Sequence, residues 1–451
     1  MFEFFWNLVS FVIALGILIT VHEYGHFWVA RKNGVKVQKF SIGFGKTLWS
    51  HIGKDGTEYV IALIPLGGFV KMLDDRVDDI LPEDSDKTFN SKTVYQRIAI
   101  IAAGPFANFA FAIIAFYLMF LIGVPSIKPM IGNIEPASIS AMANLPAQSQ
   151  IVEVAGKKVT DWQDVNLALV GEIGSSTIEI KTKQEDSVNI ITSVLNTKEW
   201  QFSPDKISAI DSLGIKPFRP NVYNELAVIH PDSPAAISGL KVGDVLLEVN
   251  GISVKDKWYD FSNKIQTLAD QSVEILIERE GLNQIITVVP KAISRNGTKI
   301  GYLGVTPKSD KYPEKFKINT SYGLLDALEQ SINRTWNLVV LSFDMIGKLL
   351  IGDVSVKNLS GPISIAQGAG DSANFGLVYF LGFLALISIN LGIINLLPLP
   401  VLDGGHLLYY IIELFTGKPV PEKIQEVGFK FGTITLLCLM SIALFNDLSR
   451  L

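Results

Sequence analysis

The chain has few cysteines, histidines and charged residues. Cys438 is its only cysteine among 451 residues, so no disulfide can form within the chain. Charged residues make up 18%, the formal net charge is −5, and the absence of a long basic run argues against nucleic-acid partners. Residues 1–7 contain no lysine or arginine, and no small-residue cleavage pattern follows, so a cleavable signal peptide is not expected.

What the chain does have is long apolar runs. Hydrophobic residues make up 48% and the mean hydropathy is +0.33, which fits a few spans in a lipid bilayer plus a sizeable soluble part. Four runs are long enough to cross a bilayer. They are Phe5–Ala30, Ile98–Val124, Phe375–Leu399 and Phe429–Phe445. The alternative for each run is a buried helix of a soluble domain.

The positions of lysine and arginine predict the orientation of these spans. Basic residues follow the first run between residues 31 and 46, and Lys92 and Arg97 precede the second. Because loops rich in lysine and arginine stay in the cytoplasm, residues 31–97 are expected to be cytoplasmic. Residues 125–374 and both termini are then expected on the outer side.

The first run contains the pattern His22-Glu23-Tyr24-Gly25-His26. On a helix, His22 and His26 share a face, and Glu23 lies one residue round from it. Two imidazoles placed in this way can hold one zinc ion while the carboxylate reaches a water beside it. The alternative is a chance match between ordinary core histidines, which is uncommon in a chain with five histidines.

A catalytic zinc site needs a third protein ligand. Around the third run, Asn390, Asn395, two prolines and Asp403 interrupt the apolar residues. Polar, non-helical backbone at membrane depth is tolerated only inside protein or beside a wet cavity, so Asp403 is a candidate ligand. His406, three residues further on, is the other candidate for the third ligand. The alternative interpretation of the whole polar segment is a plain loop just beyond the membrane.

The expected outer segment contains an internal repeat. Residues of 138–159 recur without a gap in 233–254, which predicts two copies of one domain. The second copy resembles a PDZ domain closely, and the first resembles it more weakly, with Gln148-Ser149 in place of Gly243-Asp244. PDZ domains bind extended peptides at a sheet edge, although both copies could act only as spacers. After the repeat, helical periodicity over 321–351 predicts an amphipathic helix.

The two polar motifs together resemble the double signature of the site-2 proteases, which are intramembrane zinc metalloproteases. These motifs are the histidine pattern at 22–26 and the segment Asn395–Gly404. Residues 104–108 and 361–364 also match that family. The arrangement of four spans, with tandem PDZ domains between the second and third, resembles that of a bacterial branch of the family. The resemblance covers essentially the whole chain.

The resemblance implies a polytopic α-helical membrane protein with four transmembrane helices, a membrane-associated β-hairpin and two tandem PDZ domains. Its place would be the bacterial inner membrane, with the PDZ domains and both termini in the periplasm. The expected divisions are a first span at 1–30, a cytoplasmic loop with the hairpin at 31–97, a second span at 98–124, PDZ domains at 125–220 and 221–309, a periplasmic linker with an amphipathic helix at 310–374, a third span at 375–403, a cytoplasmic loop at 404–428 and a fourth span at 429–451.

The resemblance also implies roles for single residues. It makes His22, His26 and Asp403 the ligands of Zn²⁺, with Glu23 as the catalytic base. Asn395 is the best candidate for stabilising the oxyanion, and Asn390 is the second. The alternative for both asparagines is an interhelical hydrogen bond.

A substrate helix must be unwound before it can be cut, so an extended binding site is expected. Residues 59–72 are rich in strand formers, with Gly67-Gly68 as a turn signal, and they resemble the hairpin of these proteases. Its edge, including Phe69 and Val70, is expected to pair with substrate, unless it is an ordinary cytoplasmic hairpin.

The expected substrates are single-span membrane proteins, such as a membrane-anchored anti-sigma factor or leftover signal peptides. The outer domains would filter these substrates by size. A membrane-anchored PDZ adaptor with an inactive metal site and a metal transporter are the competing functions.

Overall fold

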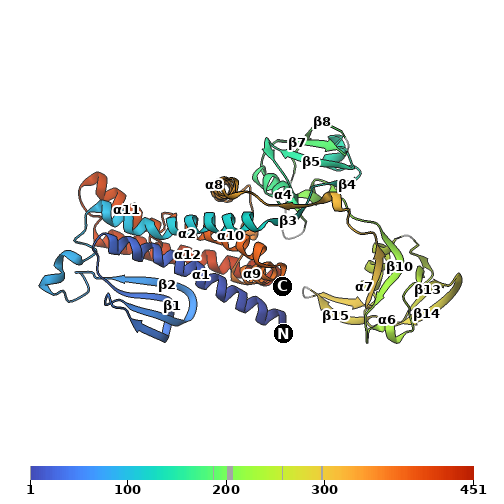
Figure 1. Cartoon of the computed structure of the whole chain (residues 1–451), viewed down its shortest axis with the longest axis horizontal. Coiled ribbons are helices and arrows are strands. Elements are labelled where there is room, and N and C mark those ends of the chain that lie inside the picture. The colour runs from blue at the N-terminus through green and yellow to red at the C-terminus, as the bar shows by residue number, and fades with distance from the viewer. Residues whose placement is uncertain (1, 186, 201–206, 256, 296–297, 451) are drawn as a thin grey trace.

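The computed structural model describes residues 2–185, 187–200, 207–255, 257–295 and 298–450. It contains a bundle of long helices with a small sheet beside one end of α1, and two β-rich units on other sides (Figure 1). Four helices of the described chain are long and apolar enough to cross a membrane, which confirms that prediction. They are α1 (Phe2–Lys32), α2 (Val94–Ile122), α10 (Leu377–Leu396) and α12 (Glu422–Arg450).

Helices α1 and α2 pack closely because small residues line their contact. A Cβ atom on Gly25 of α1 would collide with the carbonyl group of Ala103 and lie 2.8 Å from the Cβ atom of Ala107. Close approach through small residues is the usual way in which membrane helices associate. Helix α2 begins at a capping box, in which Thr93 and Gln96 each bind the other's backbone N–H.

The third span ends earlier than expected, and a further helix follows it. Helix α10 stops at Leu396, and residues 397–402, with Pro398 and Pro400, are not helical. Prolines cannot continue a helix, because they lack the N–H donor and clash with the preceding turn. The chain restarts at Asp403 as helix α11 (Asp403–Thr416), so the connection expected at 404–428 between the third and fourth spans is largely helical.

Strands β1 (Val37–Ile52) and β2 (Glu58–Met72) form a small bent sheet beside α1 (Figure 1). Lys39 of β1 lies opposite both Lys71 and Glu58, so the start of β1 has a part of β2 on each side. Residues 68–72 of β2 pair with β1 alone among the described strands, which makes them an edge of this sheet.

The glycine pair in this sheet lies at the end of a chain reversal within β2. Residues 58–61 run parallel to 39–42 of β1 and residues 68–72 run antiparallel to the same residues, so the chain reverses between 61 and 68. A tighter turn joins β1 to β2 at residues 53–57, where Gly56 has a φ of +79°. Gly68 is required for another reason, since a Cβ atom there would lie 2.9 Å from the Cγ atom of Glu23. The glycine therefore lets β2 lie directly against α1.

The two β-rich units are built alike, as the repeat predicts. In the first, Ser138 lies against Gly214 and the N–H of Ser140 donates to the carbonyl of Leu213. In the second, Ser233 lies against Gly304 in the same way, and the N–H of Ala235 donates to the carbonyl of Leu303. Each unit has its own apolar core.

The first unit contains β4 (Ile131–Ile134), α3 (Ile139–Met142), β5 (Ser149–Val154), β6 (Lys157–Lys158), α4 (Trp162–Gly171), β7 (Thr177–Gln184), β8 (Ile190–Asn196), α5 (Ala209–Ser212) and β9 (Ile215–Pro217). The second contains β10 (Val222–Ile229), α6 (Pro234–Ile237), β11 (Val245–Val249), β12 (Ile252–Ser253), α7 (Trp258–Thr267), β13 (Val273–Arg279), β14 (Leu282–Val288), β15 (Lys291–Arg295), β16 (Thr298–Tyr302) and β17 (Val305–Ser309). The main sheet of the first unit has the order β6-β5-β7-β8, and that of the second has β14-β13-β11-β10-β17.

A two-stranded stem joins the two units to the helices. Strand β3 (Val124–Ile127) leaves α2 and pairs in antiparallel register with β18 (Lys317–Thr320), which leads into α8 (Leu324–Ile351). The predicted amphipathic helix is therefore present as α8. Because Ile127 pairs with Lys317, both chain ends of the tandem units leave the membrane helices at one place.

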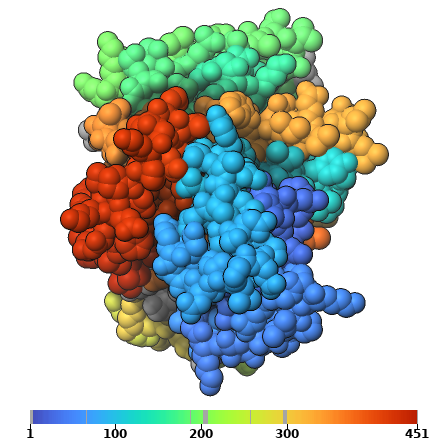
Figure 2. Space-filling model, turned by 90° about the vertical axis from the view of Figure 1, so that its left-hand side faces the viewer, coloured from blue at the N-terminus to red at the C-terminus, as the bar shows by residue number. Residues whose placement is uncertain are grey.

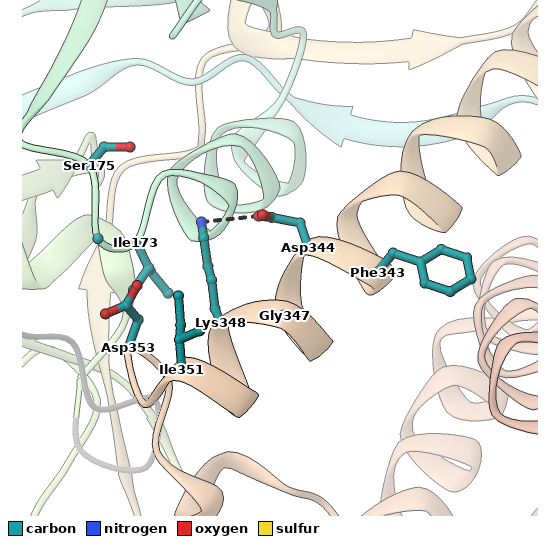
Figure 3. A pocket seen from close by; sticks show the side chains of 9 residues that line it. Ile173, Ser175, Phe343, Asp344, Gly347, Lys348, Ile351 and Asp353 are labelled. Atoms are coloured by element: carbon teal, nitrogen blue, oxygen red, sulfur yellow. Dashed lines mark ion pairs between the residues drawn. The ribbon is translucent and has the colours of Figure 1, made fainter. Parts of the chain in front are cut away.

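Helix α8 also holds the first unit against the bundle. Arg334 of α8 donates to Asp164 of α4 at 2.7 Å. Further along, Lys348 pairs with Asp344 of its own helix at 3.0 Å (Figure 3) and donates to the carbonyl of Gly171, the last residue of α4. The opposite side of α8 packs on α2 and α10. The first unit is therefore tied to the spans through α8.

The segment 361–364, noted in the sequence, marks the start of helix α9 (Pro362–Phe375). Its free N–H groups are bound by a carboxylate from another helix, since Asp447 of α12 accepts from Gly361, Ile363 and Ser364 at 2.9–3.1 Å. Asp447 is 2% exposed. A carboxylate is favoured at a helix N-terminus, so this contact fixes the end of α12 to α9.

Candidate metal centre

The structure brings the three predicted ligands together. The Nε2 atoms of His22 and His26 on α1 lie 3.3 Å apart. The Oδ2 atom of Asp403, from the start of α11, lies 3.2 Å from the first and 3.3 Å from the second. Both histidines are buried, and in the described chain these three residues are the one His, Cys, Asp and Glu group able to hold a metal ion.

The spacing of these atoms fits zinc. Ligands about 2.05 Å from a tetrahedral centre lie about 3.3 Å from one another, which is the separation found for all three pairs. The Oδ2 atom of Asp403 is buried and accepts no hydrogen bond within the described chain. Electron-rich atoms crowded together in this way need a cation between them, and two imidazoles with a carboxylate are a donor set that zinc takes.

The other nitrogen of each imidazole has a partner. Nδ1 of His26 lies 2.9 Å from the carbonyl oxygen of Ile100, which is an acceptor, so this nitrogen carries the proton and Nε2 is free to bind metal. Nδ1 of His22 lies 3.1 Å from the side-chain amide of Asn108, which is fully buried.

Asn108 was not assigned a role from the sequence. If Nε2 of His22 binds metal, its Nδ1 carries the proton, and the amide of Asn108 must then present its oxygen. The only sequence signal was an asparagine inside an apolar span, in the segment 104–108 that matches the site-2 proteases. Its contact with a histidine more than eighty residues away in the chain was not readable from local spacing.

Glycines make room for the metal-binding side chains. A Cβ atom on Gly104 of α2 would collide with the imidazole of His26 and lie 2.8 Å from Cε1 of His22. Gly404 and Gly405 of α11 lie against the backbone of residues 396–400, where any side chain would also collide. Residues 397–402, which connect α10 to α11, therefore fold tightly over the first turn of α11. This places Asp403 opposite the histidines.

Glu23 lies beside this group and is 8% exposed. It occupies the next position on α1 after His22, and Gly68 at the edge of β2 contacts its side chain. A carboxylate, a metal-binding group and a strand edge thus meet at one place.

The remaining predicted residues are placed as follows. Asn395 is half-buried in the last turn of α10, two residues before the connection to α11, and its role stays a prediction. Asn390 accepts a hydrogen bond from Ser342 of α8 at 3.3 Å, which is the interhelical bond that was its alternative. His406 is exposed and lies outside the three-residue group.

The comparisons with known proteins agree with this site. A model of peptidase family M50 matches residues 10–439, so the chain belongs to this family, that of the site-2 proteases, and is a zinc metalloprotease. Protease RseP of Yersinia pestis is 50% identical to it over 100% of both chains. The regulator of sigma-E protease RseP of Escherichia coli is 48% identical, and the regulator of sigma E protease of Haemophilus influenzae is 45% identical, again over 100% of both chains.

Among solved structures, the PDZ domain of an SdrC-like protein from Listeria monocytogenes is 25% identical. It covers 20% of this chain and 92% of its own length, with a TM-score of 0.17.

The geometry predicts which of the two rival ligands the metal needs. Asp403→Ala should remove most of the bound zinc, because it deletes one of the three converging atoms. His406→Ala should leave the zinc content at that of the unaltered chain. Metal analysis of both purified variants measures this, and the opposite pattern of loss would exchange the two assignments.

Proposed function

We propose that this chain hydrolyses peptide bonds within transmembrane segments of single-span proteins, with His22, His26 and Asp403 as the ligands of one zinc ion. The observation that carries the proposal is the triangle of ligand atoms at 3.2–3.3 Å on helices of membrane-spanning length. Glu23 is buried beside this triangle.

In this proposal each residue has a chemical task. Bound zinc supplies Lewis acidity at the scissile carbonyl. Glu23 takes the proton of the attacking water and delivers it to the leaving amine. The amide of Asn395, on the last turn of α10, donates to the oxyanion that develops on the carbonyl. The imidazoles keep their orientation through Ile100 and Asn108.

Glu23→Gln should retain zinc and fold yet lose proteolysis by at least about a hundredfold, because the amide cannot accept the water's proton. The assay is cleavage of a single-span model substrate by purified protein in detergent, with zinc content measured on the same samples. Glu58→Gln, which removes a carboxylate from β2, is the matched control and should keep its activity. Turnover by Glu23→Gln close to that of the control would remove Glu23 from the mechanism.

The edge of β2 is the proposed binding site for the unwound substrate. A helix cannot be cut as a helix, because its carbonyl groups are hydrogen-bonded and shielded. Residues 68–72 present a free strand edge, and Gly68 brings that edge against Glu23. An extended segment added to this edge would place its backbone at the metal site.

Exposed apolar side chains on the same sheet support its insertion into the membrane. Large apolar residues of both strands are exposed there, and charged residues are few among them. They are Phe44, Leu48, Trp49, Ile52, Ile61, Leu63, Ile64 and Phe69. A soluble sheet would bury such a surface, so contact with lipid explains it.

Proline substitutions test the strand edge. Successive residues of a strand direct their N–H groups to opposite sides, so one of Phe69 and Val70 faces β1 and the other faces outward. Proline at the outward position should impair cleavage more than alanine there, because it removes a donor that only the substrate would use. Proline at the other position should destabilise the sheet itself. Equal cleavage by folded proline and alanine variants at both positions would exclude pairing with substrate.

We propose further that the two β-rich units are periplasmic PDZ domains that filter substrates by size. The stem of β3 and β18 holds both units at the end of α2 remote from the basic loop, and α8 ties the first unit to the spans. Proteins with bulky outer domains would collide with the units, whereas shortened ones would reach the site. The relatives' names point to regulation of sigma-E, so the proposed substrates are a membrane-anchored anti-sigma factor and remnant signal peptides in the bacterial inner membrane.

Two deletions test the filter, and the stem shows where to make them. Since the N–H of Lys128 donates to the carbonyl of Phe316, joining these residues by a two-residue Asn-Gly turn closes the stem as a hairpin. Removing 222–309 alone joins Asn221 to Asp310, whose backbones are hydrogen-bonded, and keeps the first unit. The larger deletion should permit cleavage of a long substrate that the intact enzyme refuses.

The control reaction is cleavage of a substrate already shortened on its outer side, which should change little in either deletion. The smaller deletion shows whether the second unit alone is responsible. If a deleted enzyme retains zinc, cuts the short substrate and still refuses the long one, the units do not act as a size filter.

A further inference from the structure

We infer that the ion pair between Arg97 and Glu413 is a positioning element of the metal centre, because it fixes the helix that supplies Asp403. The inference rests on the proposed zinc site. Arg97 lies in the first turn of α2 and Glu413 in the last turn of α11, and these helices lie side by side at one end of the bundle (Figure 1). Seen from that end, the C-terminal helices border the segment leading into α2 (Figure 2).

The contacts of Arg97 define one geometry. Its Nη2 atom donates to Oε1 of Glu413 at 2.8 Å, and its Nε atom donates to the carbonyl of Lys92 at 3.2 Å. The guanidinium lies 4.9 Å from the ring centre of Tyr410. Both side chains of the ion pair are only 13% exposed. A pair so shielded from water is stronger and more sharply oriented than an exposed one.

Arg97 lies on the face of α2 that contacts the metal site. On α2, residues 97, 104 and 108 follow a helical repeat and share one face, so the face that holds Glu413 also contacts both histidines through Gly104 and Asn108. On α11, Asp403 and Tyr410 are seven residues apart and share a face, and Glu413 lies about one turn beyond Tyr410. One stripe of α2 thus holds the histidines and α11 together.

The connection before α11 explains why a distant contact is needed. Residues 397–402 are not helical and contain Pro398 and Pro400, so α10 does not continue into α11 and cannot set its rotation. Glu413 lies about 15 Å along the helix from Asp403. A contact at that distance resists rotation and tilt of α11, and so keeps the carboxylate opposite the imidazoles.

The experiment measures zinc release from purified, zinc-loaded protein to an excess of chelator. Glu413→Ala should release zinc at least about tenfold faster, which is the usual scale for losing a support of a metal ligand. Glu413→Gln keeps a hydrogen-bond acceptor but no charge, so its rate of zinc release should lie between those of the unaltered chain and Glu413→Ala. The double change Arg97→Glu with Glu413→Arg should bring the rate of zinc release most of the way back to that of the unaltered chain.

A control is Asp164→Ala, which breaks another partly shielded interhelical ion pair, that with Arg334, away from the site and should leave zinc release unchanged. Thermal unfolding without metal identifies variants that fail to fold. If Glu413→Ala fails to fold, Arg97→Lys gives the comparison instead, since it keeps the charge but loses the planar fork.

The possible failures can be told apart. Unchanged zinc release in folded variants of Glu413, or a charge-reversed pair that releases zinc as fast as Glu413→Ala, would overturn the inference alone. An unaltered chain that binds no zinc would refute the proposed metal centre and the inference with it.

Discussion

Two imidazole nitrogens and one carboxylate oxygen face one another at 3.2–3.3 Å inside a bundle of apolar helices. Without a cation, this arrangement places electron-rich atoms together in a largely buried site, which costs free energy. With a cation, the same atoms form a tetrahedral donor set. Much of the surrounding structure can be understood as what is needed to bring these three atoms together and hold them there.

Helix α2 makes most of the contacts that hold the ligands in place, although it supplies no ligand itself. Its face contributes the carbonyl of Ile100, the space at Gly104 and the amide of Asn108, each of which contacts a histidine of α1. The same helix packs against α11, which begins at the carboxylate. The apolar environment strengthens these few polar contacts, because no water competes for them.

The sheet and the outer units supply none of the three ligand atoms, and the proposed function gives them control of access to the site. The edge of β2 approaches Glu23 only because Gly68 has no side chain. The outer units return to the bundle through one stem, so they can occupy space over the helices without interrupting the packing of the spans. A protease that cuts inside a membrane must exclude folded domains while admitting an extended segment, and under the proposed function the outer units would do the first and the edge of β2 the second.

Local patterns in the sequence predicted the four spans, the shared face of His22 and His26, and the repeated outer unit, because each depends on neighbouring residues or on the comparison of two segments. Asp403 was named as a ligand from its unusual setting and from the resemblance to site-2 proteases. These features are recorded in the order of residues along the chain, so they can be read without coordinates.

Other features were decided by tertiary structure alone. Gly67-Gly68 had the composition of a turn, and the chain does reverse just before the pair, but the need for Gly68 where the strand meets α1 could not be read from the sequence. The partnership of Asn108 with His22, the ion pair of Arg97 with Glu413 and the helix α11 were not foreseen. Each depends on residues far apart in the chain meeting in an apolar interior, and such meetings leave no periodic signal in the sequence.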